Sequence, residues 1–175
     1  MNLKLAAKSQ GELAESGTID GVAFDAFLNT NGADYVWTGS YGSQKIKVTV
    51  HFSTKDPDAF MVSGTVGSSA ISMNCPPESA NATSFPLTGS IGGQKLKVLW
   101  DERTATLKGT LGSASFQFVG HANGSKILIT GSATDGRTTG KTSFNFSRNA
   151  IVGTVSGPAV GLLCLLGEFV GVEAE

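Results

Sequence analysis

Apolar and polar residues alternate along most of this chain. Residues 45–52 read Lys-Ile-Lys-Val-Thr-Val-His-Phe, and residues 95–100 read Lys-Leu-Lys-Val-Leu-Trp. A period of two is typical of a β-strand that buries one face. The helical period of 3.6 is absent except in residues 3–14, which fit either a short amphipathic helix or a terminal strand. The pattern therefore predicts an all-β protein.

An internal repeat accompanies the alternation. Residues 38–48 recur with few changes as residues 88–98, and a Gly-Ser or Gly-Thr step recurs every 20 to 25 residues along the chain. That interval accommodates two strands and two turns, so it predicts serial hairpins. The glycines of the recurring steps are Gly17, Gly39, Gly64, Gly89, Gly109, Gly131 and Gly153.

These glycines fall on the apolar face of their predicted strands. A glycine weakens a strand, so its recurrence needs an explanation. Glycine within a strand usually permits sheet coiling, forms a bulge or leaves room for a neighbouring ring. We expect aromatic rings such as those of Phe52, Trp100 and Phe118 to lie over the glycines.

Turn chemistry supports the hairpins. Steps such as Gly42-Ser43 and Asn123-Gly124 supply the positive φ that tight hairpin turns require. Residues 53–58 and 135–140 form longer polar connections. We expect tight turns at one end of the sheet and both longer connections at the other, where recognition loops would lie.

The segments add up to an antiparallel meander of about 12 or 13 short strands, from near Thr18 to near Leu166, built from repeated hairpins. We expect a barrel or a flattened barrel; a three-fold arrangement like a β-trefoil or β-prism is the alternative. Residues 1–16 form an N-terminal segment, either a short helix or a covering strand, and residues 17–175 form a single β domain. An apolar face turned outward to lipid is disfavoured, because most alternating runs span only seven or eight residues.

Charge and hydropathy exclude several classes of protein. The 13 basic and 14 acidic side chains give a net charge of -1, without the basic groove that nucleic acid requires. The apolar run from Pro158 to Val172 is too short for a transmembrane helix and contains Glu168. The first ten residues lack the apolar core of a cleaved signal peptide, so the default expectation is a cytoplasmic protein.

Residues able to carry out catalysis or bind metal are sparse. His51 and His121 have no motif spacing, and the two cysteines lack the C-x-x-C spacing of a metal or redox site. Residues 29–34 resemble the start of a calcium loop, but Ser40 stands where a bidentate Glu is needed. We expect no metal, no cofactor and no catalytic residues, and we lean against an enzyme. The remaining candidates are the acidic pairs Asp56/Asp58 and Asp101/Glu102, taken as solvated turns, and Cys75 and Cys164, taken as small core residues.

One segment is apolar on both faces. Residues 159–167 read Ala-Val-Gly-Leu-Leu-Cys-Leu-Leu-Gly, so a half-exposed sheet would leave leucines in water. Either the N-terminal segment covers them, or they form the interface of a homo-oligomer.

A barrel of this many strands is too wide to be filled by its own wall. The leading functional hypothesis is therefore non-catalytic binding of a small apolar or amphiphilic molecule inside the barrel. The alternative is a structural or interaction module, binding carbohydrate or forming oligomers, with no enclosed ligand site. The candidate lining residues are Trp37, Tyr41, Phe52, Trp100 and Phe118.

Overall fold

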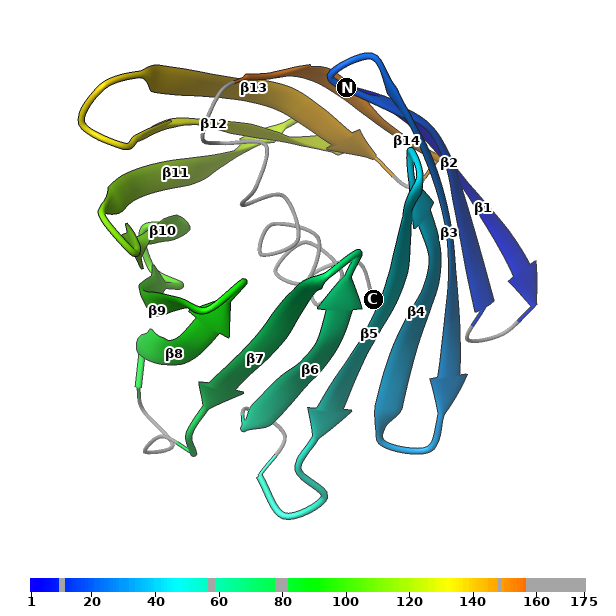
Figure 1. The fold of residues 1–175 in the computed structure, drawn as a ribbon, viewed down its shortest axis with the longest axis horizontal. Helices are drawn as coiled ribbons and strands as arrows, with labels where there is room; N and C mark the ends of the chain where they lie inside the picture. Colours follow the sequence, from blue (N-terminus) through cyan, green and yellow to red (C-terminus); the bar gives the residue numbers. More distant parts are fainter. Residues whose placement is uncertain (10–11, 57–58, 78–81, 148, 157–175) are drawn as a thin grey trace.

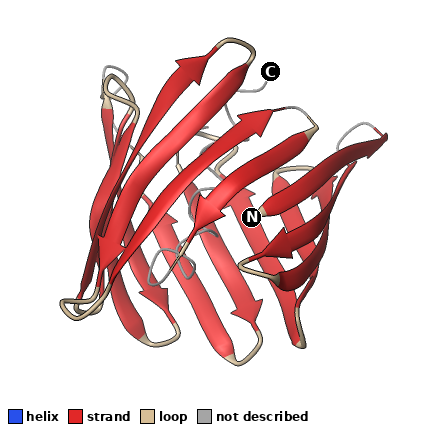
Figure 2. Cartoon of the chain, turned by 90° about the horizontal axis from the view of Figure 1, so that it is seen from above, coloured by secondary structure: helices blue, strands red, loops and turns tan. Residues whose placement is uncertain are grey.

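The chain forms a closed barrel of antiparallel strands in a computed structural model, which describes residues 1–9, 12–56, 59–77, 82–147 and 149–156. Figure 1 shows the strands following one another around the wall, and Figure 2 shows their inclination and the short turns between them. The strands are β1 (Asn2–Ser9), β2 (Glu12–Ile19), β3 (Val22–Asn31), β4 (Asp34–Tyr41), β5 (Gln44–Phe52), β6 (Phe60–Val66), β7 (Ser69–Cys75), β8 (Ser84–Ile91), β9 (Gln94–Asp101), β10 (Thr106–Leu111), β11 (Ala114–Asn123), β12 (Lys126–Thr134), β13 (Thr139–Ser147) and β14 (Ala150–Val155).

Every strand pairs with its neighbours in the chain, and β1 closes the wall by pairing with β14. The predicted all-β meander and barrel are confirmed, and the three-fold alternative is wrong. The predicted strand count was too low, because the first hairpin was not recognised: residues 2–9 and 12–19 are β1 and β2. Leu3, Leu5 and Leu13 are spaced so that a helix and a strand both fit, and the pairing of β1 with β2 and with β14 selects the strand.

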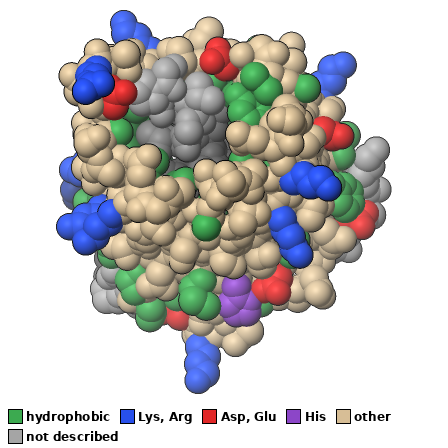
Figure 3. Space-filling model, viewed as in Figure 1, with side chains coloured by type: hydrophobic (Ala, Val, Ile, Leu, Met, Phe, Trp, Pro, Cys, Tyr) green, Lys and Arg blue, Asp and Glu red, His purple; other side chains and the backbone are tan. Residues whose placement is uncertain are grey.

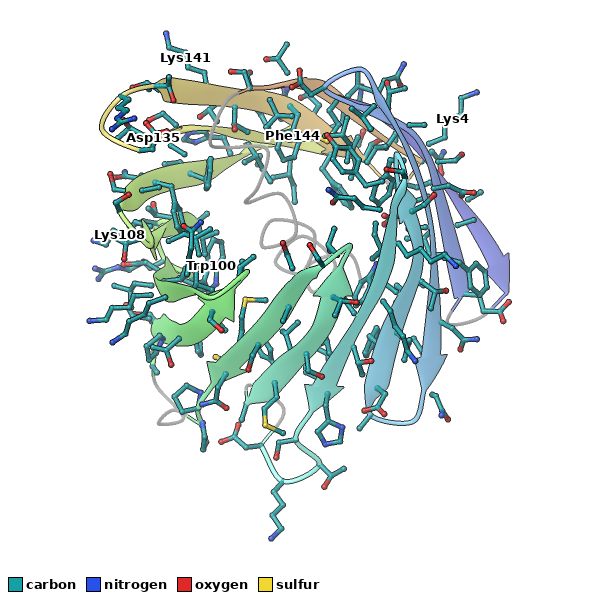
Figure 4. All side chains as sticks on the ribbon, viewed as in Figure 1. Lys4, Trp100, Lys108, Asp135, Lys141 and Phe144 are labelled. Atoms are coloured by element: carbon teal, nitrogen blue, oxygen red, sulfur yellow. The ribbon has the colours of Figure 1, made fainter. Side chains whose placement is uncertain are left out.

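The apolar face of the sheet points into the barrel. Side chains in register on neighbouring strands share a face, and the set that includes Val62, Leu87 and Leu96 is buried. The alternating set, which includes Lys47 and Lys97, is exposed. In Figure 4, Trp100 and Phe144 are directed inward, whereas Lys4, Lys108 and Lys141 are directed away from the barrel. We call the buried side of the wall the interior face.

The recurring glycines lie one on each even-numbered strand, where the backbone of the preceding strand comes close. A Cβ built on Gly109 would be 2.1 Å from the Lys97 carbonyl oxygen, and the other six glycines give 1.9 to 2.2 Å to the matching carbonyl. Real Cβ atoms do not approach so closely. The glycines therefore permit tight coiling of the wall.

Phenylalanine side chains are in register with four of these seven glycines: Phe24 with Gly17, Phe116 with Gly109, Phe118 with Gly131 and Phe144 with Gly153. Phe118 is in register with Gly131, and its ring lies 2.6 Å from a Cβ built there. Phe52 is in register with Phe60, and Trp100 with Phe85 and Leu107, so neither lies opposite a glycine. The expectation therefore holds for Phe118 but not for Phe52 or Trp100, and the close approach of two backbones is the feature that all seven glycines share.

The glycine position shifts regularly around the wall. Gly39 is in register with Ile46, and Ile46 with Val66, which is two residues beyond Gly64. The same two-residue step separates Gly89 from Gly109, through Leu96 and Leu111. Such a stagger is what inclines the strands of a closed barrel to its axis.

The two longer connections lie at opposite ends of the barrel. Residues 53–59 follow β5, an odd strand, whereas residues 135–138 follow β12, an even strand. The connection after β12 therefore lies at the same end of the barrel as the tight turn at Gly42, which also follows an even strand. The expectation that both longer connections lie opposite the tight turns is wrong.

Candidate binding surface inside the barrel

Four aromatic side chains form a continuous cluster on β4, β5 and β6, which we call the ring cluster. Tyr35 and Trp37 are stacked with centroids 6.4 Å apart, Tyr35 meets Phe52 edge-on at 5.2 Å, and Phe52 lies 5.6 Å from Phe60. These side chains pack against the buried core yet are only partly buried themselves. The ring cluster therefore offers a partly exposed aromatic surface on the interior face.

The five predicted lining residues all lie on the interior face, in two groups. Trp37 and Phe52 belong to the ring cluster, and Tyr41 lies farther along β4. Trp100 on β9 and Phe118 on β11 are both in register with Leu107 on β10. Phe118 is only 1% exposed and stacks on Phe116 at 5.6 Å, so it is part of the packed wall. Whether these residues hold a ligand stays a prediction.

The sequence did not single out Glu15, although it lies on the interior face of β2. Its register partners are Leu5 on β1 and Ala26 on β3, both buried. Among the described side chains of the strands, it is the only acidic or basic one that the register places on this face. Burial raises the pKa of its carboxyl group above the ordinary value of 4.5.

A sequence signal for Glu15 does exist in the recurring glycines. Glu15 stands two residues before Gly17, and the corresponding residues of the other six even strands are all apolar: Trp37, Val62, Leu87, Leu107, Ile129 and Ile151. The signal was missed because residues 3–14 also fitted a helix, which left the face of Glu15 unassigned.

Two aromatic residues of β4 flank the row that contains Glu15. Ala26 is in register with Gly39, and the interior positions on either side of Gly39 are Trp37 and Tyr41. The Tyr41 hydroxyl donates a hydrogen bond of 3.3 Å to the Ile19 carbonyl oxygen, so its ring reaches from β4 across β3 to the strand of Glu15.

A second polar group on the interior face lacks a hydrogen bond. Thr142 on β13 is 3% exposed, and its Oγ1 has no partner. Its register partners are Gly131 and Val155, which present no polar side chain.

The other candidates for chemistry lie on the outside or in loops. His51 Nδ1 lies 2.5 Å from Asp34 Oδ1, but the pair is exposed on the outer face, and His121 is exposed as well. Asp101 accepts a hydrogen bond from the Thr104 backbone N–H, which lowers the pKa of its carboxyl group. Both Asp101 and Glu102 border a turn, as expected.

Several sequence predictions are only partly covered by the described residues. Cys75 is buried on the interior face of β7, whereas Cys164 and residues 159–167 lie outside the described residues, as does Asp58. Within the described ranges, no three His, Cys, Asp or Glu side chains are grouped so as to hold a metal ion. The same part of the chain has no helix long and apolar enough to cross a membrane. On the face shown in Figure 3, charged side chains are dispersed rather than gathered into a patch.

Comparison of the chain with protein-family models, with curated proteins and with solved structures found no match. Arguments about function therefore depend on the interior face itself.

Proposed function

We propose that the barrel binds a small apolar or amphiphilic molecule against its interior face, without catalysis. The observation that carries this proposal is the closed wall of fourteen strands whose apolar face points inward. Eight strands enclose a space that side chains just fill, and the enclosed width grows with the number of strands. A wider interior lined by apolar side chains favours an apolar occupant over water.

The ring cluster supports the same proposal. Its aromatic side chains pack on the core but remain partly exposed on the concave side of the wall. Large rigid rings with exposed faces are typical anchors in ligand sites, because they give contact area at a small cost in conformational entropy.

Mass spectrometry of the freshly purified protein under native and denaturing conditions tests this function. We expect an additional mass of about a few hundred daltons, as for a ligand of drug-like size, that is released on unfolding. In parallel, the fluorescence of N-phenyl-1-naphthylamine should rise on binding. Trp37→Ala should weaken this binding roughly tenfold, since truncation of an aromatic anchor costs more than about 1 kcal/mol.

The matched control is Val36→Ala, which changes the neighbouring outward position of β4 and should leave binding of the naphthylamine unchanged. A clean protein mass together with no fluorescence change would overturn the proposal. The assembly state seen in the native spectrum would then test the alternative, an interaction module that forms oligomers.

A further inference from the structure

Glu15 lies two residues before a recurring glycine, a position that is apolar in each of the other even strands of the barrel. The six corresponding residues of the other even strands are all apolar, and its register partners Leu5 and Ala26 are buried. Withdrawing a carboxylate from water costs free energy unless a partner offsets it. No hydrogen bond or ion pair to Glu15 occurs in the described part of the chain. A carboxyl group in this position, without a partner among the described residues, would be stabilised as a carboxylate by a cationic group of a ligand.

We propose that Glu15 binds the positively charged amino group of an amphiphilic ligand whose hydrocarbon part lies on the interior face. This inference rests on the proposed function, and it names the chemical class of the ligand.

The surroundings of Glu15 favour a cation over other head groups. Ala26 and Gly39, the next two positions in the same row, have no side chain long enough to cover the carboxylate. Trp37 and Tyr41 occupy the interior positions of β4 on either side of that row, and the Tyr41 hydroxyl reaches Ile19, four residues beyond Glu15 on β2. A carboxylate without a partner, on an apolar wall that also presents aromatic rings, is chemistry that suits an ammonium group.

Other head groups fit less well. An anionic head group would be repelled by Glu15, with little screening in an apolar interior. A hydroxyl group would donate one hydrogen bond but would leave the negative charge without a counter-charge.

Three ligands that differ only in the head group test the inference on the full chain. Decylamine, decanol and decanoate would each displace N-phenyl-1-naphthylamine at neutral pH, below their micellar concentrations. With the unaltered protein, we expect decylamine to bind roughly tenfold more tightly than decanol, the usual order for a charge-assisted hydrogen bond, and decanoate to bind most weakly.

Glu15→Gln should abolish the preference for decylamine and leave the affinity for decanol unchanged. Asp25→Asn is the matched control: it removes the same charge from the neighbouring strand, but on the exposed outer face, so the preference should persist. A thermal unfolding curve of each variant verifies that it is folded.

The outcomes separate the two proposals. Equal binding of decylamine and decanol by the unaltered protein, or a preference that survives Glu15→Gln, would overturn the role of Glu15 while the proposed function stands. A preference lost equally in Asp25→Asn would show a general effect of net charge and would also overturn it. Failure of the naphthylamine to bind at all would overturn the proposed function, and this inference with it.

Discussion

At the scale of single residues, the interior face is set by glycines that permit close backbones and by one carboxyl group that departs from the apolar pattern. Gly109 and its six counterparts leave the space that the preceding strand occupies. Glu15 occupies a position where an apolar residue would cost less free energy. The glycines serve folding, whereas Glu15 has no structural benefit that its contacts explain.

Glu15→Gln should stabilise the ligand-free protein at neutral pH. Burial raises the pKa of Glu15 in the folded state, so the unfolded chain releases this proton first as pH rises above 4.5. The free energy of unfolding of the unaltered protein should therefore decrease as pH rises from 4.5 to the folded-state pKa. The free energy of unfolding of the variant should not show this decrease. Thermal unfolding measured across this range checks the prediction. The same dependence of the unfolding temperature on pH in both proteins would contradict it.

Gly109→Ala should destabilise the barrel by about 2–4 kcal/mol, because the new Cβ would collide with the Lys97 carbonyl oxygen. Gly120→Ala is a matched control on the next strand: its Cβ would lie 3.7 Å or more from any neighbour, so its effect should be neutral or stabilising by up to about 1 kcal/mol. Urea denaturation of both variants measures the difference. Equal losses of stability would show that close backbone approach is not the reason for Gly109.

At the scale of elements, the unit of the wall is a hairpin whose even strand contains the recurring glycine. Positive φ at Gly42, Gly67 and Gly112 ends three of these even strands in tight turns. The connection from β12 to β13 is different, since the Asp135 carboxylate accepts hydrogen bonds of 2.8 Å from the backbone N–H groups of Arg137 and Thr138. There the Asp135 side chain shapes the connection together with the positive φ of Gly136.

Asp135→Asn should lower the thermal unfolding temperature at neutral pH. The two backbone hydrogen bonds lower the pKa of Asp135 below 3.8, so its stabilisation is present above that pH and is lost as pH falls through the folded-state pKa. The difference between the proteins should therefore vanish in acid. Arg137→Ala is the control, because it preserves the backbone donor and should change stability little. A difference independent of pH would exclude this mechanism.

At the scale of the whole molecule, closure depends on a short seam. Only three register pairs join β1 to β14, from Asn2 with Val152 to Lys4 with Ala150, whereas eight join β3 to β4. Beyond these pairs, the backbone N–H of Leu5 donates to the Asn149 carbonyl oxygen at 2.9 Å, and Met1 and Gly153 exchange hydrogen bonds of 2.7 and 3.0 Å. The first and last described strands thus close the barrel over a shorter paired length than the adjoining strand pairs.

Amide hydrogen exchange should be fastest along this seam. Local opening of β1 from β14 breaks fewer hydrogen bonds than opening within the wall, so its free energy should be lower. Exchange measured by mass spectrometry should show less protection in peptides from β14 than in peptides from β4 and β5, which serve as the internal reference. Uniform protection around the ring would contradict this expectation.

Much of this architecture was predictable from local pattern. Alternation in residues 45–52 predicted strands, and the recurring glycine steps predicted serial hairpins, because a strand and its turn depend on neighbours in sequence. The first hairpin was not predictable in this way. Its leucines fit both the helical period and the strand period, and the pairing of β1 with β14 joins residues about 150 positions apart. The inward set of aromatic residues followed from alternation. The face of Glu15 follows in the same way from its place two residues before Gly17, once residues 12–19 are known to form a strand.

By itself, the sequence determined the class of the fold, the hairpin unit, the glycine positions and which residues share an apolar face. Each of these follows from the period of two and from turn chemistry, which act over a few residues. Only the tertiary structure decided that residues 2–9 and 12–19 are strands of the wall and that the meander closes with fourteen strands, by pairing of β1 with β14. Closure depends on strand stagger and on the pairing of distant ends, and no local pattern contains that information.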